Sequence, residues 1–352
     1  MKDVKRFVKV GDLPTGEKNN ICDVPGVKVG HYTLNNETHH TGLTAILPHD
    51  GNMFRKKVEG GSFAFNGFGK SVGLMQIDEL GTIETPIILT NTLNVGGVSD
   101  GLVKYMLANN KEICTICGTV NPVVMECNDG KLNNIREILF GEKEVLNVIA
   151  SANDDFIQGS VGAGAGMICN GLKGGIGSSS RKITINTKDY TVGVLVNSNF
   201  GPSNSKALIF NGRPIGEDIY RINQSKNEYD KGSIIVVVAT DVPLDSRQLR
   251  RVAKRAALGI ARTGSYAGNG SGDVFVSFST ANITNHFEEN STRQIEVLKD
   301  DYIEKVFKAT VLATEEAILN SMLFSPTVKG YLGEAKSINE YRELFEDMLI
   351  NE

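Results

Sequence analysis

The chain has 352 residues, of which 40% are hydrophobic and 22% are charged, as in globular proteins with a sizeable core. Its formal charge of −4 lacks the basic excess of a dedicated nucleic-acid binder, so we expect no nucleic-acid partner. The longest strongly apolar run, 234–239, is far shorter than the roughly 18 residues of a membrane span, so no membrane partner is expected. Five dispersed cysteines and a charged N-terminus with no apolar stretch behind it predict a cytoplasmic protein without a disulfide framework.

The first half of the chain combines short strands with a few helices. Strands are expected at 27–30, 43–48, 60–68 and 86–90, and a first helix near Ser71. A second helix should begin at Ser99 or Asp100, because the apolar residues that follow have helical spacing. Alternation predicts a strand over 113–124, and helical patterns predict helices over 133–140 and 142–150.

The second half begins with a glycine-dense section, 159–177, that leads into a predicted hairpin of strands 182–185 and 190–197. Turn-forming residues over 202–228 indicate a long connection, and 233–239 is predicted to be a buried strand. An amphipathic helix follows, capped by Asp245 or Ser246 and ending near 263–264. Its apolar face comprises Leu249, Val252, Ala253, Ala256 and Ile260.

A last helix is predicted over 302–322. Strands and helices therefore come in grouped blocks rather than in strict βαβ alternation, which favours a layered α+β sandwich over a doubly wound parallel sheet.

The segment Gly-Asn-Gly-Ser-Gly-Asp at 268–273 holds one hydroxyl, that of Ser271, among residues that tolerate unusual backbone angles. A tight bend here would bring the hydroxyl close to the carbonyl of Gly270, although a plain loop has the same composition. His286 is the only histidine in the last 300 residues, so a Ser-His-Asp triad is weakly supported. If the Gly270–Ser271 bond is cut, the new α-amine of Ser271 can itself accept the proton.

Other motifs have structural interpretations that we prefer. The glycines of 162–166 lack the acidic residue that a dinucleotide site requires about 20 positions later, so a close backbone crossing is expected. Cys114 and Cys117 have CxxC spacing without a second pair, which favours core cysteines over a zinc site. For the histidines of the first 50 residues we expect structural or surface roles, and no metal site.

The order of several motifs along the chain is more specific than any one of them. They are DVPGVKVGH at 23–31, TGLTAILP at 41–48, ECNDG at 126–130, GSVGAG at 159–164, KGGIG at 173–177 and GNGSGD at 268–273. In this set the chain resembles the self-processing N-terminal-serine aminopeptidases, which include the L-aminopeptidase/D-amidase-esterases and the β-peptidyl aminopeptidases. The resemblance extends from about Asp23 to Asn320, nearly the whole chain.

This resemblance implies a four-layer αββα sandwich, of the type shared with ornithine acetyltransferases. It further implies one catalytic domain, 1–352, made as a precursor and cut into a large subunit, 1–270, and a small subunit, 271–352. The substrates would be small peptides or aminoacyl amides and esters, hydrolysed without a metal or an organic cofactor. Processed pairs of the family commonly assemble as tetramers, so a homo-oligomer is expected.

The resemblance also implies roles for individual residues. Ser271 would be the nucleophile, and the side-chain amide of Asn199 would donate to the oxyanion. Glu126 would bind the free α-amine of the substrate, and Glu315 would orient the surroundings of the serine. Some members of the family have a serine where this chain has Ala313.

Two other functions stay open from the sequence. One is acyl transfer, as in the similarly folded self-processing ornithine acetyltransferases, although these use a threonine nucleophile. The other is a non-catalytic nucleotide-binding protein that uses the glycines of 162–166.

Overall fold

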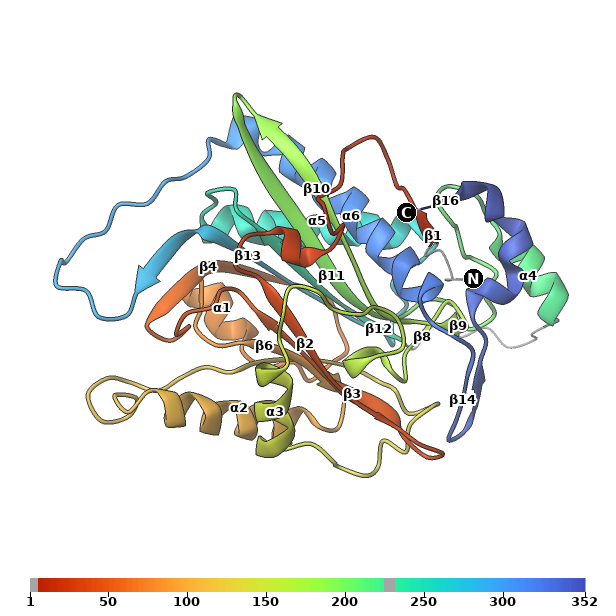
Figure 1. The fold of residues 1–352 in the computed structure, drawn as a ribbon, viewed down its shortest axis with the longest axis horizontal. Coiled ribbons are helices and arrows are strands. Elements are labelled where there is room, and N and C mark those ends of the chain that lie inside the picture. Colours follow the sequence, from red (N-terminus) through yellow and green to blue (C-terminus); the bar gives the residue numbers. More distant parts are fainter. Residues whose placement is uncertain (1–5, 225–231, 352) are drawn as a thin grey trace.

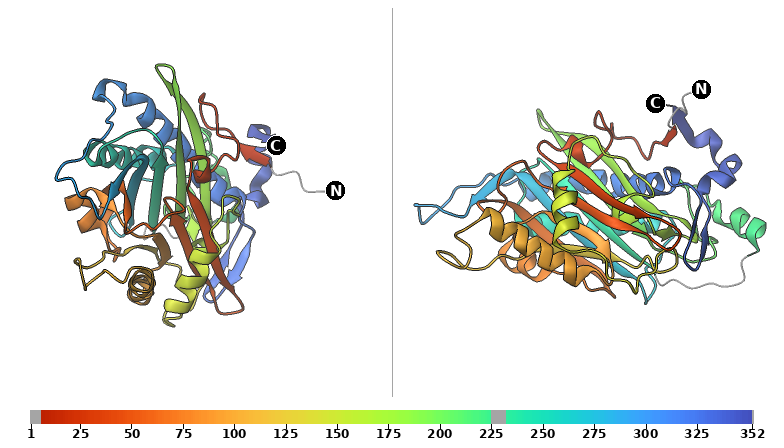
Figure 2. Two further views of the ribbon diagram at one scale, coloured as in Figure 1. Left: turned by 60° about the vertical axis from the view of Figure 1, so that its left-hand side comes forward. Right: turned by 60° about the horizontal axis from the view of Figure 1, so that its bottom comes forward.

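Two stacked β-sheets form the centre of the molecule, and helices cover both outer faces (Figure 1). The computed structural model describes residues 6–224 and 232–351. Views from two further directions show the same stacking of sheets and helices (Figure 2). The predicted four-layer αββα sandwich is therefore confirmed.

The larger sheet has six strands, and its order brings segments far apart in the sequence side by side. In that order they are β10 (Gly175–Ile185), β11 (Lys188–Asn199), β12 (Ser233–Thr240), β13 (Gly272–Asn285), β4 (Lys56–Gly67) and β5 (Thr82–Ile83). β12 and β13 are parallel, whereas the other neighbours are antiparallel. The C-terminal β13 thus lies inside the sheet, between β12 and β4.

The smaller sheet has four strands, in the order β2 (Lys28–Asn35), β3 (His40–Leu47), β6 (Ile87–Asn91) and β7 (Val123–Cys127). β6 and β7 run parallel. Short pairs lie at the periphery: β1 (Arg6–Val8) with β16 (Leu349–Asn351), β8 (Ile168–Cys169) with β9 (Leu172–Lys173), and β14 (Val328–Gly330) with β15 (Gly333–Ala335).

The helices divide between the two outer faces. α5 (Ser246–Arg262) and α6 (Glu304–Leu323) cover the larger sheet, whereas α2 (Val95–Asn109) and α3 (Glu142–Ala150) cover the smaller one. Two shorter helices are α1 (Leu74–Leu80) and α4 (Gly216–Asn223). The 3₁₀ segments are η1 (Ile21–Asp23), η2 (Gly162–Gly164), η3 (Asp300–Tyr302), η4 (Ile338–Leu344) and η5 (Glu346–Met348).

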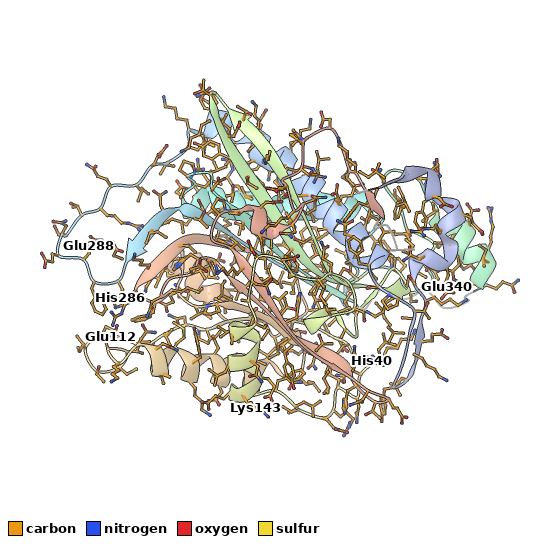
Figure 3. All side chains as sticks on the ribbon, in the orientation of Figure 1. His40, Glu112, Lys143, His286, Glu288 and Glu340 are labelled. Carbon is orange, nitrogen blue, oxygen red and sulfur yellow. The ribbon has the colours of Figure 1, made fainter. Side chains whose placement is uncertain are left out.

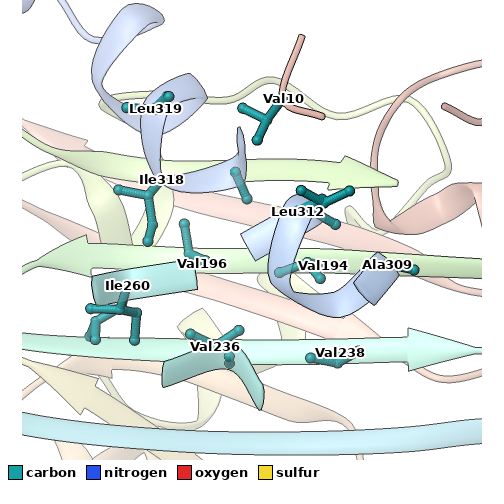
Figure 4. Packing of buried hydrophobic residues seen from close by; sticks show 14 of the residues in the cluster. Val10, Val194, Val196, Val236, Val238, Ile260, Ala309, Leu312, Ile318 and Leu319 are labelled. Atoms are coloured by element: carbon teal, nitrogen blue, oxygen red, sulfur yellow. The ribbon is translucent and has the colours of Figure 1, made fainter. Parts of the chain in front are cut away.

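Buried apolar side chains fill the three spaces between the four layers. β12 is a strand that contributes side chains to two of these spaces. Val236 and Val238 belong to the cluster beneath α5 and α6, which also contains Ile260 and Leu312 (Figure 4). The alternate residues of the strand, with Val237 among them, belong to the cluster between the sheets. A strand covered on both faces must be apolar throughout, which is why 234–239 is the longest apolar run of the chain.

The strongest sequence patterns predicted their elements well. α5 begins at Ser246, with the side chain of Asp245 accepting a hydrogen bond of 2.7 Å from the backbone N–H of Gln248. The five residues predicted for its apolar face are all buried. The helix over 142–150 and the hairpin of β10 and β11 are also confirmed, although both strands are longer than predicted.

Other predictions were wrong where tertiary contacts replace local patterns. α2 begins at Val95 rather than near Ser99, and glycines at 96 and 97 weakened its helical signal. Residues 133–140 form turns instead of a helix, because the side chain of Asn94 accepts hydrogen bonds from the backbone of Leu139 and Phe140. The strand expected over 113–124 is confined to its end, where β7 starts at Val123.

The long connection predicted over 202–228 contains a helix that the sequence reading missed, α4. The last residues of this connection, 225–228, lie outside the described part of the chain.

His31 of β2 packs beside the glycine-rich segment in its neutral form. Its Nε2 lies 3.1 Å from the carbonyl oxygen of Ile157, so this nitrogen carries the proton. Its Nδ1 then accepts from the hydroxyl of Thr44, at 2.9 Å. Burial lowers the pKa of His31 to about 4.

This environment makes the fold sensitive to acid. The unfolded chain binds a proton at His31 below pH 6.5 whereas the folded chain does so only near pH 4, so stability falls as the pH drops through that window. We expect His31→Gln to lose less free energy of unfolding between pH 7 and pH 4 than the wild type does. Urea unfolding at several pH values would measure the difference, and parallel curves for the two proteins would contradict it.

Candidate active site

Ser271 lies at the point where an exposed loop enters the centre of the larger sheet. It directly precedes β13 and is 1% exposed. Its hydroxyl donates a hydrogen bond of 2.7 Å to Oδ1 of Asp273, and its backbone N–H donates to the carbonyl oxygen of Gly268 at 2.8 Å. The side chain of Asn66, from β4, donates to the same carbonyl oxygen at 2.7 Å. Hydrogen bonds thus hold both the backbone N–H and the hydroxyl of Ser271, and the partner of the hydroxyl is a carboxylate.

The left-handed backbone angles of the loop before Ser271 lie ahead of the 268–273 segment, in which the sequence indicated unusual angles. Left-handed backbone angles occur at Gly264, with φ of 98°, and at Ala267, with φ of 53°. Such an angle costs an alanine about 1–2 kcal/mol, which the surrounding contacts must offset. Gly272 has a different reason to be glycine: a Cβ there would lie 2.4 Å from the carbonyl oxygen of Phe68.

Strand register brings Asn199 to the same edge of the sheet. Asn199, at the end of β11, pairs with Ser233 of β12, and Ser233 pairs with Gly272 of β13. The hydroxyl of Ser233 also accepts a hydrogen bond of 3.3 Å from the backbone N–H of Gly272. Because neighbouring strands lie about 4.8 Å apart, Asn199 is two strands away from the residue that follows Ser271.

The side-chain amide of Asn199 is fixed by backbone groups on both of its ends. Its Oδ1 accepts from the N–H of Ile168 at 2.8 Å, and its Nδ2 donates to the carbonyl oxygen of Asn128 at 3.0 Å. A backbone N–H can only donate and a carbonyl can only accept, so these contacts decide which end of the amide is nitrogen. Nδ2 carries a second N–H, which the contact with Asn128 does not use.

Glu126 comes to this edge from the other sheet, at the end of β7, and is 4% exposed. Its Oε1 accepts from the backbone N–H of Lys70 at 2.9 Å, and its Oε2 accepts from the hydroxyl of Thr92. Both donors are neutral, so no cation neutralises the carboxylate through these bonds. Glu126 lines a hollow of about 40 Å³, whose other walls are Phe68, Lys70, Thr92, Asn128, Ser233 and Gly270.

Glu315 is connected to the loop before Ser271 through Arg262. It is fully buried in α6, and its Oε2 accepts from Nε of Arg262, the last residue of α5. Burial raises the pKa of this carboxyl, although Arg262 opposes the effect. Ala313, two residues earlier in the same helix, is also fully buried. The carboxylate that touches the hydroxyl of Ser271 is Asp273, which the sequence reading missed.

The residues of the site that were not predicted from the sequence carried only weak local signals. Asp273 follows Ser271 by two positions, and such residues share a side of a strand, so the start of a strand at Gly272 would have indicated the contact. Asn66, Thr92 and Ser233 come from other strands or loops, and only the register of the sheets brings them here.

The preferred structural interpretation of the glycine-rich segment is confirmed. Residues 162–166 are buried, and a Cβ on Gly164 would lie 2.3 Å from the backbone nitrogen of Ile176. The segment is therefore a close backbone crossing, without the exposed turn and long helix that a dinucleotide site needs. The nucleotide-binding alternative loses its structural basis.

The cysteine prediction was wrong, whereas the structural role expected of the early histidines is seen in hydrogen bonds of His39 with Asn133, at 2.9 Å, and of His49 with the carbonyl oxygen of Lys56, at 2.7 Å. Cys114 is exposed and Cys117 half-buried, because their segment forms a turn instead of a core strand. His40 and His286 are well separated in the view of Figure 3, with His286 towards the left and His40 right of the centre. Within residues 6–224 and 232–351, no group of three or more potential ligands could hold a metal ion. No helix in this described part is long and apolar enough to cross a membrane.

Comparisons with known proteins identify the family of this chain. The model of peptidase family S58 matches residues 19–336. A beta-peptidyl aminopeptidase of Sphingosinicella microcystinivorans is 37% identical over 341 residues, covering 90% of this chain and 84% of the relative.

Solved structures of other proteins match this chain over nearly its whole length. A protein of Pyrococcus horikoshii OT3 is 47% identical with a TM-score of 0.90, covering 96% of each chain. The L-aminopeptidase D-Ala-esterase/amidase of Ochrobactrum anthropi is 32% identical with a TM-score of 0.87, also covering 96% of each chain. The latter is a prototype of the serine aminopeptidases and a variant of the Ntn-hydrolase fold. The chain belongs to peptidase family S58 and is a hydrolase of the aminopeptidase type.

Proposed function

We propose that this aminopeptidase cuts its own chain between Gly270 and Ser271 and then uses the released Ser271 as its nucleophile. The observation that carries the proposal is the buried hydroxyl of Ser271, hydrogen-bonded to the carboxylate of Asp273 at the edge of the central strands. A base at hydrogen-bonding distance is what a serine needs to become nucleophilic.

In the first reaction Oγ of Ser271 attacks the carbonyl carbon of Gly270 while Asp273 takes its proton. The carbon–nitrogen bond breaks, the amine of Ser271 is protonated, and Gly270 is left as an ester on Oγ. Water then hydrolyses this ester, which gives a carboxylate on Gly270 and a serine with a free amine and a free hydroxyl. The products are the subunits 1–270 and 271–352.

The position of β13 supports the survival of the cut protein as one particle. The small subunit contributes β13, which pairs with β12 on one side and β4 on the other. It also contributes α6, whose buried residues belong to the core beneath the helices. These hydrogen bonds and apolar contacts hold 271–352 in place once the covalent connection is gone.

In the peptidase reaction the new amine of Ser271 accepts the proton from Oγ as it attacks the first amide or ester carbonyl of the substrate. The second N–H of Asn199 donates to the oxyanion, a contribution of about 2.7–4 kcal/mol for one such donor. The amine of Ser271 passes the proton to the leaving group, and water releases the acyl-enzyme. Glu315 supports the loop through Arg262.

Glu126 binds the free α-amine of the substrate in this proposal. Its carboxylate lines the same hollow as Gly270 and receives hydrogen bonds from two neutral donors, so its negative charge remains available to an ammonium group. A hollow of about 40 Å³ suits the amine end of a small peptide, aminoacyl amide or ester. The names of the relatives, which include beta-peptidyl and L-aminopeptidases, fit this class of substrate.

The assembly is proposed to be a homo-oligomer of processed pairs, a tetramer as in the family, in the cytoplasm. Phe65, Phe68 and Tyr266 support an interface near the site, because these large apolar side chains are between 47% and 64% exposed.

Replacing the nucleophile should abolish maturation. Wild-type protein should give two bands on a denaturing gel, and Ser271→Ala should give one, because no hydroxyl is left to attack Gly270. Ser279→Ala, which removes another buried hydroxyl of β13, is the matched control and should still be cut. An uncut but active wild type would contradict the use of the amine as base.

Replacing the base should slow maturation without preventing folding. Asp273→Asn keeps the shape of the side chain but cannot accept the proton, so self-cleavage should slow by about 100-fold. The conversion of freshly made precursor, followed by intact mass against time, would measure this rate. Cleavage at the wild-type rate would remove Asp273 from the mechanism.

Neutralising Glu126 should weaken the binding of substrates with a free amine. Glu126→Gln retains an acceptor for the N–H of Lys70 but loses the charge, so kcat/KM for an aminoacyl p-nitroanilide should fall about tenfold or more, mainly through KM. The N-acetylated substrate is the control, because it presents no ammonium group. An equal loss for both substrates would show that Glu126 does not read the amine.

A further inference from the structure

Lys173, in β9, is a fully buried charged residue to which the mechanism above gives no role. Its Nζ donates to three carbonyl oxygens, those of Gly164 at 3.1 Å, Met167 at 3.0 Å and Gly174 at 2.7 Å. An ammonium group has three N–H bonds, so these acceptors satisfy all of them. Burial lowers the pKa of Lys173 to about 7, and the negative charge of Asp129 opposes this shift.

One of these three carbonyls leads to the candidate oxyanion site. The peptide unit between Met167 and Ile168 accepts from Lys173 through its oxygen and donates to Oδ1 of Asn199 through its N–H, at 2.8 Å. In a trans peptide the C=O and N–H bonds point in opposite directions. Lys173 and Asn199 therefore lie at opposite edges of one peptide unit, and hydrogen bonds join them through it.

The series of hydrogen bonds continues through the side-chain amide of Asn199. Its Oδ1 receives the N–H of Ile168, and its Nδ2 donates to Asn128 and carries the second N–H. Hydrogen bonds in such a series polarise one another, and the positive charge that Lys173 carries when protonated strengthens each donor along it. The peptide also blocks rotation of the amide, because a flipped Asn199 would set its NH₂ group against the N–H of Ile168.

We propose that Lys173 is a positioning residue for catalysis, which acts through the Met167–Ile168 peptide to orient and polarise the amide of Asn199. The inference rests on the proposed oxyanion role of Asn199. It differs from a merely structural role, in which Lys173 only anchors the turn at 164–167, because it requires that the effect of the lysine on the reaction passes through Asn199.

A double-mutant cycle separates these two roles. Lys173→Met, Asn199→Ala and the double variant would be purified as processed enzyme, with active sites counted by intact mass, and assayed for kcat and KM on an aminoacyl p-nitroanilide. We expect Lys173→Met to lower kcat about tenfold or more, with less than a twofold change in KM. In the Asn199→Ala background the same substitution should change kcat less than twofold.

Lys57→Met is the matched control, because it removes another largely buried lysine, which pairs with Glu84. Lys57 lies at the other end of β4, where Lys57 pairs with Thr284 of β13. Its removal should lower stability in thermal unfolding and leave kcat per active site unchanged. If Lys173→Met does not fold, Lys173→Gln supplies the cycle, since its amide can still donate to two of the three carbonyls without carrying a charge.

The outcomes are distinguishable. An equal fold-loss of kcat from the lysine substitution in both backgrounds would overturn the coupling while leaving the proposed function intact. No loss of kcat in Asn199→Ala itself would overturn the oxyanion assignment, and with it the role of Lys173. A loss confined to the background that contains Asn199 would support both.

Discussion

The parallel pairing of β12 with β13 is the constraint on which the site depends. It sets Gly272 beside Ser233, and the antiparallel pairing of β11 with β12 sets Ser233 beside Asn199. Three strand ends thereby meet at one edge, next to Glu126 from the stacked sheet. A shift of one residue in either pairing would turn the side chains to the opposite face and separate these groups. Both faces of the larger sheet are covered, so the hydrophobic cores hold the register.

The chemistry proposed for this edge uses carboxylates and amides in place of histidine. The hydroxyl of Ser271 meets Asp273, the amide of Asn199 is locked by backbone contacts, and Glu126 is held by neutral donors. Such groups must be held in fixed positions to act on a substrate. The strands supply those positions, whereas the loop before Ser271 carries the peptide bond that is proposed to be cut.

Buried charge is used twice to connect distant segments. Lys173 ties the glycine-rich turn to β9 and to the start of β10 through three carbonyl oxygens. The fully buried pair of Arg181 and Glu316, with an Nη2–Oε2 distance of 2.6 Å, joins β10 to α6. Oε2 of Glu316 also accepts from the backbone N–H of Val10, so the pair fastens the N-terminal segment as well. The charged atoms named here all have hydrogen-bond partners, and such pairing is the condition for keeping a charge inside.

The sequence by itself determined the elements with strong periodicity and the order of the chemical motifs. The amphipathic face of α5, its Asp245 cap, the hairpin of β10 and β11 and the glycine-rich junction at Ser271 all follow from local patterns. Only the tertiary structure decided which groups meet. Glu315 and Glu316 are adjacent, yet one binds Arg262 and the other Arg181, because successive helix residues point about 100° apart. Likewise Asp273 accepts a hydrogen bond from Ser271, and Lys173 connects to Asn199 through the Met167–Ile168 peptide. Both contacts depend on how segments pack against one another, and no local sequence pattern records that packing.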